Sequence, residues 1–357
     1  MITNILVARG DPMQEITIAA VGDILINGAI SMSVKQRDAN LYDFDCIFED
    51  IAPILRDADL TIGNLEVPLK GDMPFIKKKN PRTGFPMFNG PEQLAAALKR
   101  NGFDVLVTAN NHCLDNGIEG LRRTLQVLDA NQLAHTGTYA APEQTRQPLI
   151  MNVKGIKVGI LAYTKTTNQI PLPTAMRGSV NLINEAQIIR DLRKIKPKTD
   201  LNIVCLHVGQ EYQAAPTLEQ RALVRKLLHH GADVILGSHP HVLQPILRTR
   251  SNQLAIYSLG NFVSIRLNDN PYTNNGLILQ LTIRKDESRT TISSVDWVST
   301  WTYRNFRGKR PIYRIVPNTA KASIQSRETG ISLKQRKLME QMRIYTSNLL
   351  RSREHKP

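Results

Sequence analysis

The chain of 357 residues is 41% hydrophobic and 22% charged, which are ordinary values for a soluble globular protein. This composition excludes intrinsic disorder, collagen and coiled coil, and the length suggests one large domain or about two. The net charge of +15 is concentrated in residues 301–357, where 14 Lys and Arg stand against three Glu, a balance of +11. The basic character therefore belongs to a C-terminal extension.

Short β-branched runs alternate with amphipathic segments between residues 16 and 263. We expect strands over residues 16–21, 60–62, 103–108, 156–163, 201–206, 234–236 and 254–257, and helices over 91–100, 118–128, 185–195 and 218–230. Strands that alternate with helices of this length are typical of a layered α/β domain. Two more runs, 277–283 and 291–298, have no helix between them, so we expect them to pair antiparallel and close the sheet. Residues 71–88 are expected to form a long functional or mobile loop.

Three features bear on the compartment of the protein. No run approaches the ~18 consecutive apolar residues of a membrane-spanning helix. The first twelve residues lack the basic and apolar regions of a signal peptide. Cys46, Cys113 and Cys205 are too few and too scattered for a disulfide framework or a structural zinc. We therefore expect a cytoplasmic protein with reduced thiols, neither secreted nor anchored, with a peripheral position at a membrane as the alternative.

Polar residues gather directly after five predicted strands, where α/β sheets place their ligand sites. Each segment alone has an ordinary explanation as a turn, a helix cap or a hydrogen-bonded histidine. Together they put Asp, Glu, Asn and His, all ligands of divalent metals, at the strand ends of one sheet. The segments are Gly22-Asp23, Gly63-Asn64-Leu65-Glu66, Asn110-Asn111-His112, His207-Val208-Gly209-Gln210-Glu211-Tyr212 and Gly237-Ser238-His239-Pro240-His241.

The spacing within these segments predicts where the side chains point. His239 and His241 are two residues apart, which on extended backbone points both rings to one side, and Asn64 and Glu66 have the same spacing. With Asp23, an Asn amide and a third histidine, such a set could hold two metals ~3.5–4 Å apart. We expect these residues to converge at one edge of the sheet.

This order of motifs resembles the calcineurin-like metallophosphoesterase superfamily and, more closely, its CapA branch of bacterial capsule and poly-γ-glutamate synthesis proteins. The resemblance covers about residues 16–263 and includes the five segments above, Asp115-Asn116-Gly117 and Gly260-Asn261-Phe262. It implies an α/β fold, a layered α-β-β-α sandwich of metallophosphoesterase type with a C-terminal helical extension. On this view residues 16–300 form a CapA-like domain and residues 301–357 a basic, partly helical extension.

The resemblance also implies a role for each candidate side chain. Asp23 and His241 would bind a first metal, whereas His207 and His239 would bind a second, with the amide of Asn111. The ion would be divalent, with Mn or Zn preferred over Fe or Mg. His112 would stand beside the metals as an electrostatic partner or as the general acid for the leaving oxygen.

Two departures from the wider superfamily affect the number of ions. Leu25 stands where a histidine ligand is usual, and Asn64 stands where a bridging Asp is expected, although the Asn64-Leu65-Glu66 pattern is usual in the CapA branch. A neutral amide bridges two cations poorly, so we assign Glu66 as the carboxylate ligand and keep Asn64 as a candidate. We expect one tight site at Asn111, His207 and His239 and a weaker site at Asp23 and His241, with a one-metal enzyme as the alternative.

Glu211 follows His207 by four residues and is not explained by metal binding alone. It could act as a general base, orient a metal-bound histidine, or fix its loop together with Tyr212. Other histidines and both tryptophans have structural explanations, at a strand edge, at a helix end or in packing; they are His135, His229, His230, Trp297 and Trp301.

The extension contains a predicted helix behind the capping-box pattern Ser332-Leu333-Lys334-Gln335. Its apolar stripe is Leu338, Met342, Tyr345 and Leu349, and Lys334, Lys337, Arg343 and Arg351 lie mostly elsewhere. The helix either docks on the main domain with a solvated basic face, or binds an anionic membrane or polymer. Charge alone also permits nucleic acid, but no motif for it is present.

Three functions fit these observations. The first is a metal-dependent hydrolase that acts on a phosphoester or a related bond of an anionic small molecule or polymer. The second, implied by the resemblance, is a part in making, exporting or anchoring a capsule polymer such as poly-γ-glutamate, with chemistry at an amide or γ-glutamyl group. The third is a non-hydrolytic polymer assembly or binding factor that keeps the fold, which the complete set of strand-end ligands disfavours.

Overall fold

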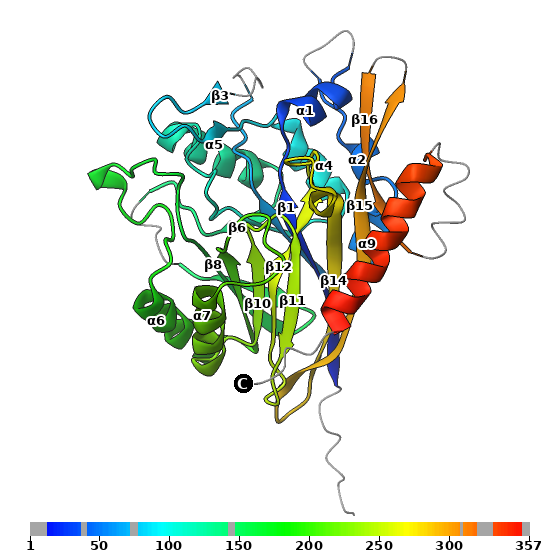
Figure 1. Cartoon of the computed structure of the whole chain (residues 1–357). Helices are drawn as coiled ribbons and strands as arrows, with labels where there is room; N and C mark the ends of the chain where they lie inside the picture. The colour runs from blue at the N-terminus through cyan, green and yellow to red at the C-terminus, as the bar shows by residue number, and fades with distance from the viewer. Residues whose placement is uncertain are drawn as a thin grey trace, which may run out of the picture.

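The computed structural model describes residues 13–36, 41–71, 78–141, 147–307, 310–319 and 331–351. Two β-sheets face each other in the centre of the molecule, with helices on the outside (Figure 1). This arrangement confirms the expected α-β-β-α sandwich, and it corrects our placement of the polar strand ends in a single sheet.

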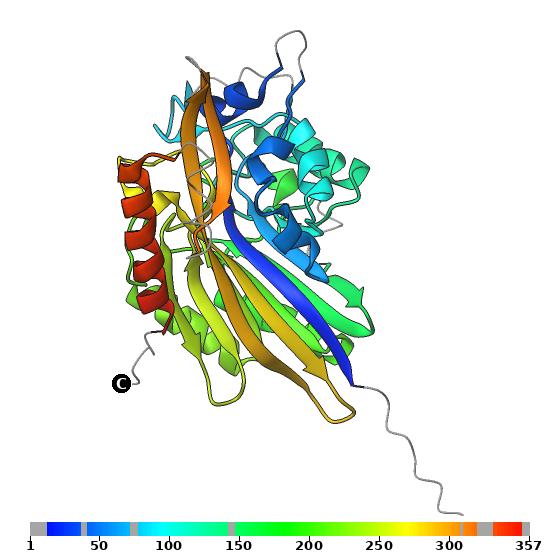
Figure 2. The same cartoon turned by 90° about the vertical axis from the view of Figure 1, so that its right-hand side faces the viewer.

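The first sheet contains eight strands, and its hydrogen-bonded order is β16-β15-β14-β1-β2-β5-β6 with β13 beside β1. The strands are β1 (Gln14–Ile24), β2 (Leu60–Leu65), β5 (Val105–Val107), β6 (Ala134–Thr136), β13 (Asn261–Val263), β14 (Asn275–Lys285), β15 (Thr290–Arg307) and β16 (Arg310–Pro317). The predicted pair of runs after residue 276 forms β14 and β15, which pair antiparallel. Figure 2 shows how far β1 and β14 run side by side.

The second sheet contains six strands in the order β11-β12-β10-β9-β8-β7. Its strands are β7 (Leu149–Val153), β8 (Ile156–Thr164), β9 (Leu201–His207), β10 (Val234–Ser238), β11 (Leu243–Arg248) and β12 (Leu254–Leu259). A short hairpin, β3 (Lys78–Lys79) and β4 (Pro86–Met87), lies within the expected loop of residues 71–88. Residues 72–77 of that loop are outside the described residues.

Side chains on both faces of the central strands are apolar because both faces are covered. Along β1, Ile16 and Ile18 pack between the sheets, whereas Ala19 and Val21 pack under helices. The helices on that side are α1 (Gly28–Val34), α2 (Asp45–Phe48), α3 (Ala52–Arg56), α4 (Gln93–Arg100) and α5 (Gly117–Ala130). On the second sheet, α6 (Glu185–Ile195) and α7 (Leu218–His229) form the outer layer. The alternation of residues along the strands thus supplies three apolar cores, one between the sheets and one under each layer of helices.

The basic C-terminal segment is partly a continuation of the sandwich. The boundary expected after residue 300 falls inside β15, and β16 adds an edge strand whose Tyr313 and Ile315 are buried in the core. In the described part of this segment, α9 (Leu333–Arg351) is the element that stands apart from the sheets, and it docks along them on the side away from α6 and α7 (Figures 1 and 2). None of the described helices is long and apolar enough to cross a membrane.

The docking face of α9 differs from the expected apolar stripe. The buried residues are Met339, Met342, Thr346 and Leu350, so three of four positions lie one residue further along the helix than predicted. Thr346 is buried because its hydroxyl accepts a hydrogen bond from Asn275 Nδ2 at 2.8 Å and donates to the Met342 carbonyl at 2.9 Å. The capping box is present, since Gln335 N donates to Ser332 Oγ and Ser332 N to Gln335 Oε1.

Candidate metal centre

The polar ends of five strands from the two sheets meet at one place in the sandwich. Asp23, Glu66 and Asn111 come from the ends of β1, β2 and β5 in the first sheet. His207 and the His239/His241 pair come from the ends of β9 and β10 in the second. All are buried except His239, which is partly exposed. The site therefore lies between the sheets, where each sheet supplies half of it.

The glycine before Asp23 permits the close approach of strands that shapes this place. A Cβ on Gly22 would lie 1.9 Å from the Gly260 carbonyl oxygen. The same carbonyl accepts a hydrogen bond from Asp23 N at 2.9 Å. Glycine is required at position 22 because any side chain would separate β1 from the segment that leads into β13.

Five residues form two groups of possible ligands that share one carboxylate. Glu66, His207 and His239 form the first group, and Asp23, Glu66 and His241 the second; within each group all ligand atoms lie within 4.8 Å of one another. His207 Nε2 is 3.4 Å from Glu66 Oε1, and His241 Nδ1 is 3.8 Å from Glu66 Oε2. Glu66 is therefore the residue that the two candidate ligand groups have in common.

The charge and hydrogen bonding of Glu66 fit a cation. Its side chain is fully buried, and neither carboxylate oxygen has a hydrogen-bond donor among the described residues. Burial, with the neighbouring Asp23 carboxylate adding to it, raises the pKa of Glu66 to about 8. A buried carboxylate without a partner is costly, so it either takes up a proton, as its raised pKa describes, or coordinates a cation.

Two of the three histidines, His207 and His239, are neutral, whereas His241 is protonated. Burial lowers the pKa of both His207 and His239 to about 3, which leaves neutral imidazoles, the form that binds metal. Burial also acts to lower the pKa of His241, but Glu66 and Asp23 outweigh it and raise the pKa to about 10. Without a metal, protonated His241 supplies the positive charge beside the Asp23 carboxylate, with its Nδ1 3.2 Å from Asp23 Oδ2.

His207 is oriented by a residue that the sequence analysis did not single out. Its Nδ1 lies 2.9 Å from Ser238 Oγ, and Ser238 pairs with His207 across β10 and β9. Its Nε2 lies 2.8 Å from Asn111 Oδ1. Since the amide oxygen of Asn111 can only accept, Nε2–H donates to it and Nδ1 accepts from the Ser238 hydroxyl. A cation bound here would take the place of that proton between Nε2 and the Asn111 oxygen.

Asn64 uses both ends of its amide within the protein. Its Nδ2 donates to Asp23 Oδ1 at 2.7 Å, and its Oδ1 accepts from Asn110 Nδ2 at 3.3 Å. Asp23 and Asn64 are neighbours on the paired strands β1 and β2, which fixes this contact. The geometry favours a role for Asn64 in holding the Asp23 carboxylate, and its assignment as a metal ligand stays a prediction.

The backbone of the His239/His241 pair corrects the expectation of an extended segment. The strand β10 ends at Ser238, and φ is +97° at His239 and +59° at His241. Pro240 between them has no N–H for a ladder, so the chain leaves the strand in a turn. The two ring centroids still lie 6.2 Å apart, and both rings reach the site from a tight turn.

His112 forms a pair with Asp115 next to this cluster. His112 Nδ1 is 2.8 Å from Asp115 Oδ2, and the same oxygen accepts from Phe88 N at 2.7 Å. The Phe88 ring packs edge-on against the imidazole with centroids 4.6 Å apart. Because Nδ1 is engaged with Asp115, Nε2 is the nitrogen of His112 that can exchange a proton.

The position of Glu211 supports one of its three possible roles. Tyr212, with φ of +64°, donates its N–H to the Pro240 carbonyl at 2.8 Å, and its ring lies 6.1 Å from that of His241. Burial and a hydrogen bond with Glu211 raise the pKa of Tyr212. These contacts favour Glu211 as part of a lock that holds the turn of the histidine pair, and its roles as base or orienting residue stay predictions.

Two asparagines contact the site and were not predicted as site residues. Asn261 is the first residue of β13 and pairs with Asp23 of β1. Its Oδ1 lies 2.9 Å from His241 Nδ1, and its Nδ2 donates to the Thr273 carbonyl. Asn168 contacts Asn111 and lies beside His112. Asn261 stands in a motif that carried the family resemblance, whereas no sequence signal marks Asn168. His135 contacts Asp129 at 3.0 Å, away from the cluster, as its structural explanation requires.

The fold and the buried ligand groups define a calcineurin-like phosphoesterase architecture. The crystal structure of the calcineurin-like phosphoesterase YfkN from Bacillus subtilis superimposes with a TM-score of 0.52 at 13% identity, over 93% of this chain and 100% of that one. Within this architecture the chain belongs to the bacterial capsule synthesis protein PGA_cap family, whose model matches residues 17–266.

Two curated relatives agree with this assignment. The chain is 31% identical to the capsule biosynthesis protein CapA of Bacillus anthracis over 255 residues, which are 70% of this chain and 60% of the relative. It is 30% identical to the PGA biosynthesis protein CapA of Bacillus subtilis (strain 168) over 247 residues, 68% of this chain and 62% of the relative. The matching part thus spans about three fifths of each relative.

Proposed function

We propose that this CapA-like protein is a metal-dependent hydrolase that acts on a phosphoester or a γ-glutamyl amide of an anionic substrate. The observation that carries the proposal is Glu66, a fully buried carboxylate with no hydrogen-bond donor in the described part of the chain, shared by two groups of candidate histidine and aspartate ligands. A site with only a structural role would satisfy this carboxylate with donors from the protein.

The chain's own residues would divide the chemistry between them. A divalent metal bound there would supply a water activated at neutral pH and would polarise the oxygen under attack. His207, His239 and Asn111 would hold one ion, Asp23 and His241 the other, and Glu66 both. His112 would give a proton from Nε2 to the leaving oxygen or nitrogen, while Asp115 stabilises the imidazolium and keeps the ring in place.

The substrate class is inferred from the relatives. Both carry names that refer to capsule or PGA biosynthesis, so we propose poly-γ-glutamate or a phosphorylated precursor of a capsule polymer as the substrate. Since the chain matches about three fifths of their length, the place of this chain in polymer synthesis is part of the proposal.

The test is a screen of the purified chain with Mn²⁺ or Zn²⁺ against phosphomonoesters, phosphodiesters and γ-glutamyl peptides. We expect hydrolysis of one of these classes that disappears with a chelator and in Glu66→Gln, which keeps the size of the side chain and removes its charge. Binding of poly-γ-glutamate without any hydrolysis would contradict the proposal and favour a polymer assembly or binding factor.

A further inference from the structure

The loop that follows β8 places an amide against the two residues at the end of β5. Asn168 is 4% exposed, and its Oδ1 accepts a hydrogen bond from Asn111 Nδ2 at 3.2 Å. Its own Nδ2 lies 3.5 Å from His112 Nδ1, which is a packing distance. Asn168, from the loop after β8, thus contacts both the candidate metal ligand Asn111 and the candidate acid His112.

The loop is built to hold this side chain. It starts beside the site, where Lys165 N donates to the His207 carbonyl at 3.0 Å. Thr166 Oγ1 then accepts from Asn168 N at 3.1 Å, and Thr167 Oγ1 donates to the Ile170 carbonyl at 2.7 Å. Asn168 has a φ of +52°, a left-handed conformation that Asn tolerates better than most residues. Such conformations persist where surrounding contacts impose them.

We propose that Asn168 is a positioning residue that sets the orientation of the Asn111 amide towards the metal. An amide has one acceptor end and one donor end, and only the oxygen can bind a cation. The hydrogen bond to Asn168 takes the donor end of Asn111, which turns its oxygen towards His207 Nε2 at 2.8 Å. Without that acceptor, the amide could turn and present its NH2 to the cation.

This inference rests on the proposed function, because it requires a metal at the His207 and His239 group. It goes further in assigning a role to a residue outside the ligand set. Partners that orient metal ligands are worth about 10–100-fold in metal affinity. The role of Asn168 is therefore measurable by metal binding alone, without any substrate.

Four variants separate the effect of the side chain from that of the backbone. Asn168→Gly removes the amide and suits the left-handed backbone, whereas Asn168→Asp keeps an accepting oxygen for Asn111 Nδ2. Gln169→Ala is the matched control, since Gln169 is the next residue, has a φ of +62° and is exposed. Asn168→Ala provides a second removal variant if the glycine variant does not fold.

The experiment titrates each variant with Mn²⁺ by calorimetry and measures the melting temperature without metal. We expect the removal variants to bind the tight Mn²⁺ ion about 10–100-fold more weakly at a nearly unchanged metal-free melting temperature. Asn168→Asp and Gln169→Ala should bind within a few-fold of wild type. Equal affinity of wild type and Asn168→Gly, or equal losses in the Gly and Asp variants, would overturn this inference alone. A wild-type chain that binds no Mn²⁺ would overturn the proposed function itself.

Discussion

At the scale of single residues, the two ligand groups differ in charge but share Glu66. The group with His207 and His239 has neutral donors apart from Glu66, whereas the other group adds the Asp23 carboxylate and a histidine that is protonated without metal. Binding an ion at Asp23 and His241 therefore has to displace a proton, which weakens it at neutral pH. This difference supports the expectation of one tight and one weaker site.

The number of ions bound by two charge-neutralising variants tests the expectation of one tight and one weaker site. Wild type should keep about one ion per chain after dialysis. Asp23→Asn should keep that ion and lose the weaker one, because Asp23 belongs to a single group. Glu66→Gln should weaken both, by at least tenfold, since both groups lose their shared carboxylate. Elemental analysis and Mn²⁺ titration measure both quantities. Two tightly retained ions in wild type would show that Glu66 fully compensates for the histidine ligand replaced by Leu25 and for the bridging carboxylate replaced by Asn64.

At the scale of elements, long sequence patterns predicted helices and strands more accurately than short ones. The helix expected over residues 185–195 is α6 without any shift, because a long apolar period and the cap at Asn184 agree. Short elements such as α2 and β6 carry too few residues for a period and were not predicted. The convergence of the candidate ligands could be predicted since they follow strand ends, whereas Ser238 and Asn168 contact them in a way that no local pattern encodes.

Tertiary contacts also determine details of α9 and of the histidine pair that the hydrophobic period of the sequence does not predict. The stripe of α9 was wrong by one residue at three positions because Thr346, polar in sequence, is buried with its hydroxyl paired to Asn275. Pro240 turned the histidine pair out of the strand for a similar reason, since the strand could not continue through it. In both places a specific side chain outweighed the general pattern.

Point variants of α9 test how firmly the helix is docked. Met342 is 5% exposed and packs in a cluster with Trp301 and Tyr303 of β15, whereas Ile344 on the same helix is 48% exposed. Met342→Ala should lower the free energy of unfolding by about 2–5 kcal/mol, and Ile344→Ala by less than about 0.5 kcal/mol. Denaturant unfolding measures both. Equal effects would mean that α9 is not held by this face.

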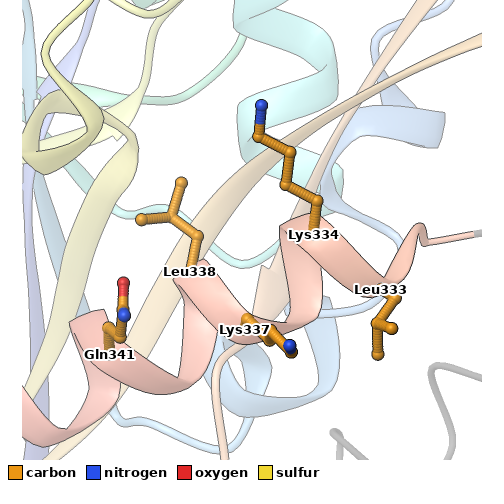
Figure 3. A pocket seen from close by; sticks show the side chains of 5 residues that line it. All are labelled: Leu333, Lys334, Lys337, Leu338 and Gln341. Carbon is orange, nitrogen blue, oxygen red and sulfur yellow. The ribbon is translucent and has the colours of Figure 1, made fainter.

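At the scale of the whole molecule, the metal centre and the basic surface of α9 lie on different elements. The centre is buried between the sheets, whereas α9 lies along their side with Lys334 and Lys337 exposed. These lysines line a surface pocket of about 460 Å³ together with Leu333, Leu338 and Gln341 (Figure 3). We infer that this surface attracts an anionic polymer or membrane, a function separate from the chemistry.

Charge reversal on α9 tests that separation. Lys334→Glu with Lys337→Glu should weaken binding to poly-γ-glutamate, or to vesicles rich in anionic lipid, by about tenfold or more, since each basic residue contributes roughly 1 kcal/mol near an anionic surface. Binding by wild type should also fall with added salt, because exposed charges are screened over about 10 Å at 0.1 M. Hydrolysis of a small substrate should stay unchanged.

The matched control reverses two exposed lysines, Lys194 and Lys198, at the end of α6 on the far side of the molecule (Figure 1). It makes the same change in net charge, so a loss of binding in both double variants would reflect the overall charge of +15 and not the surface of α9. A loss confined to the α9 variant would locate the polyanion on that helix. Salt-independent binding that neither variant alters would contradict an electrostatic role and leave α9 with its packing role alone.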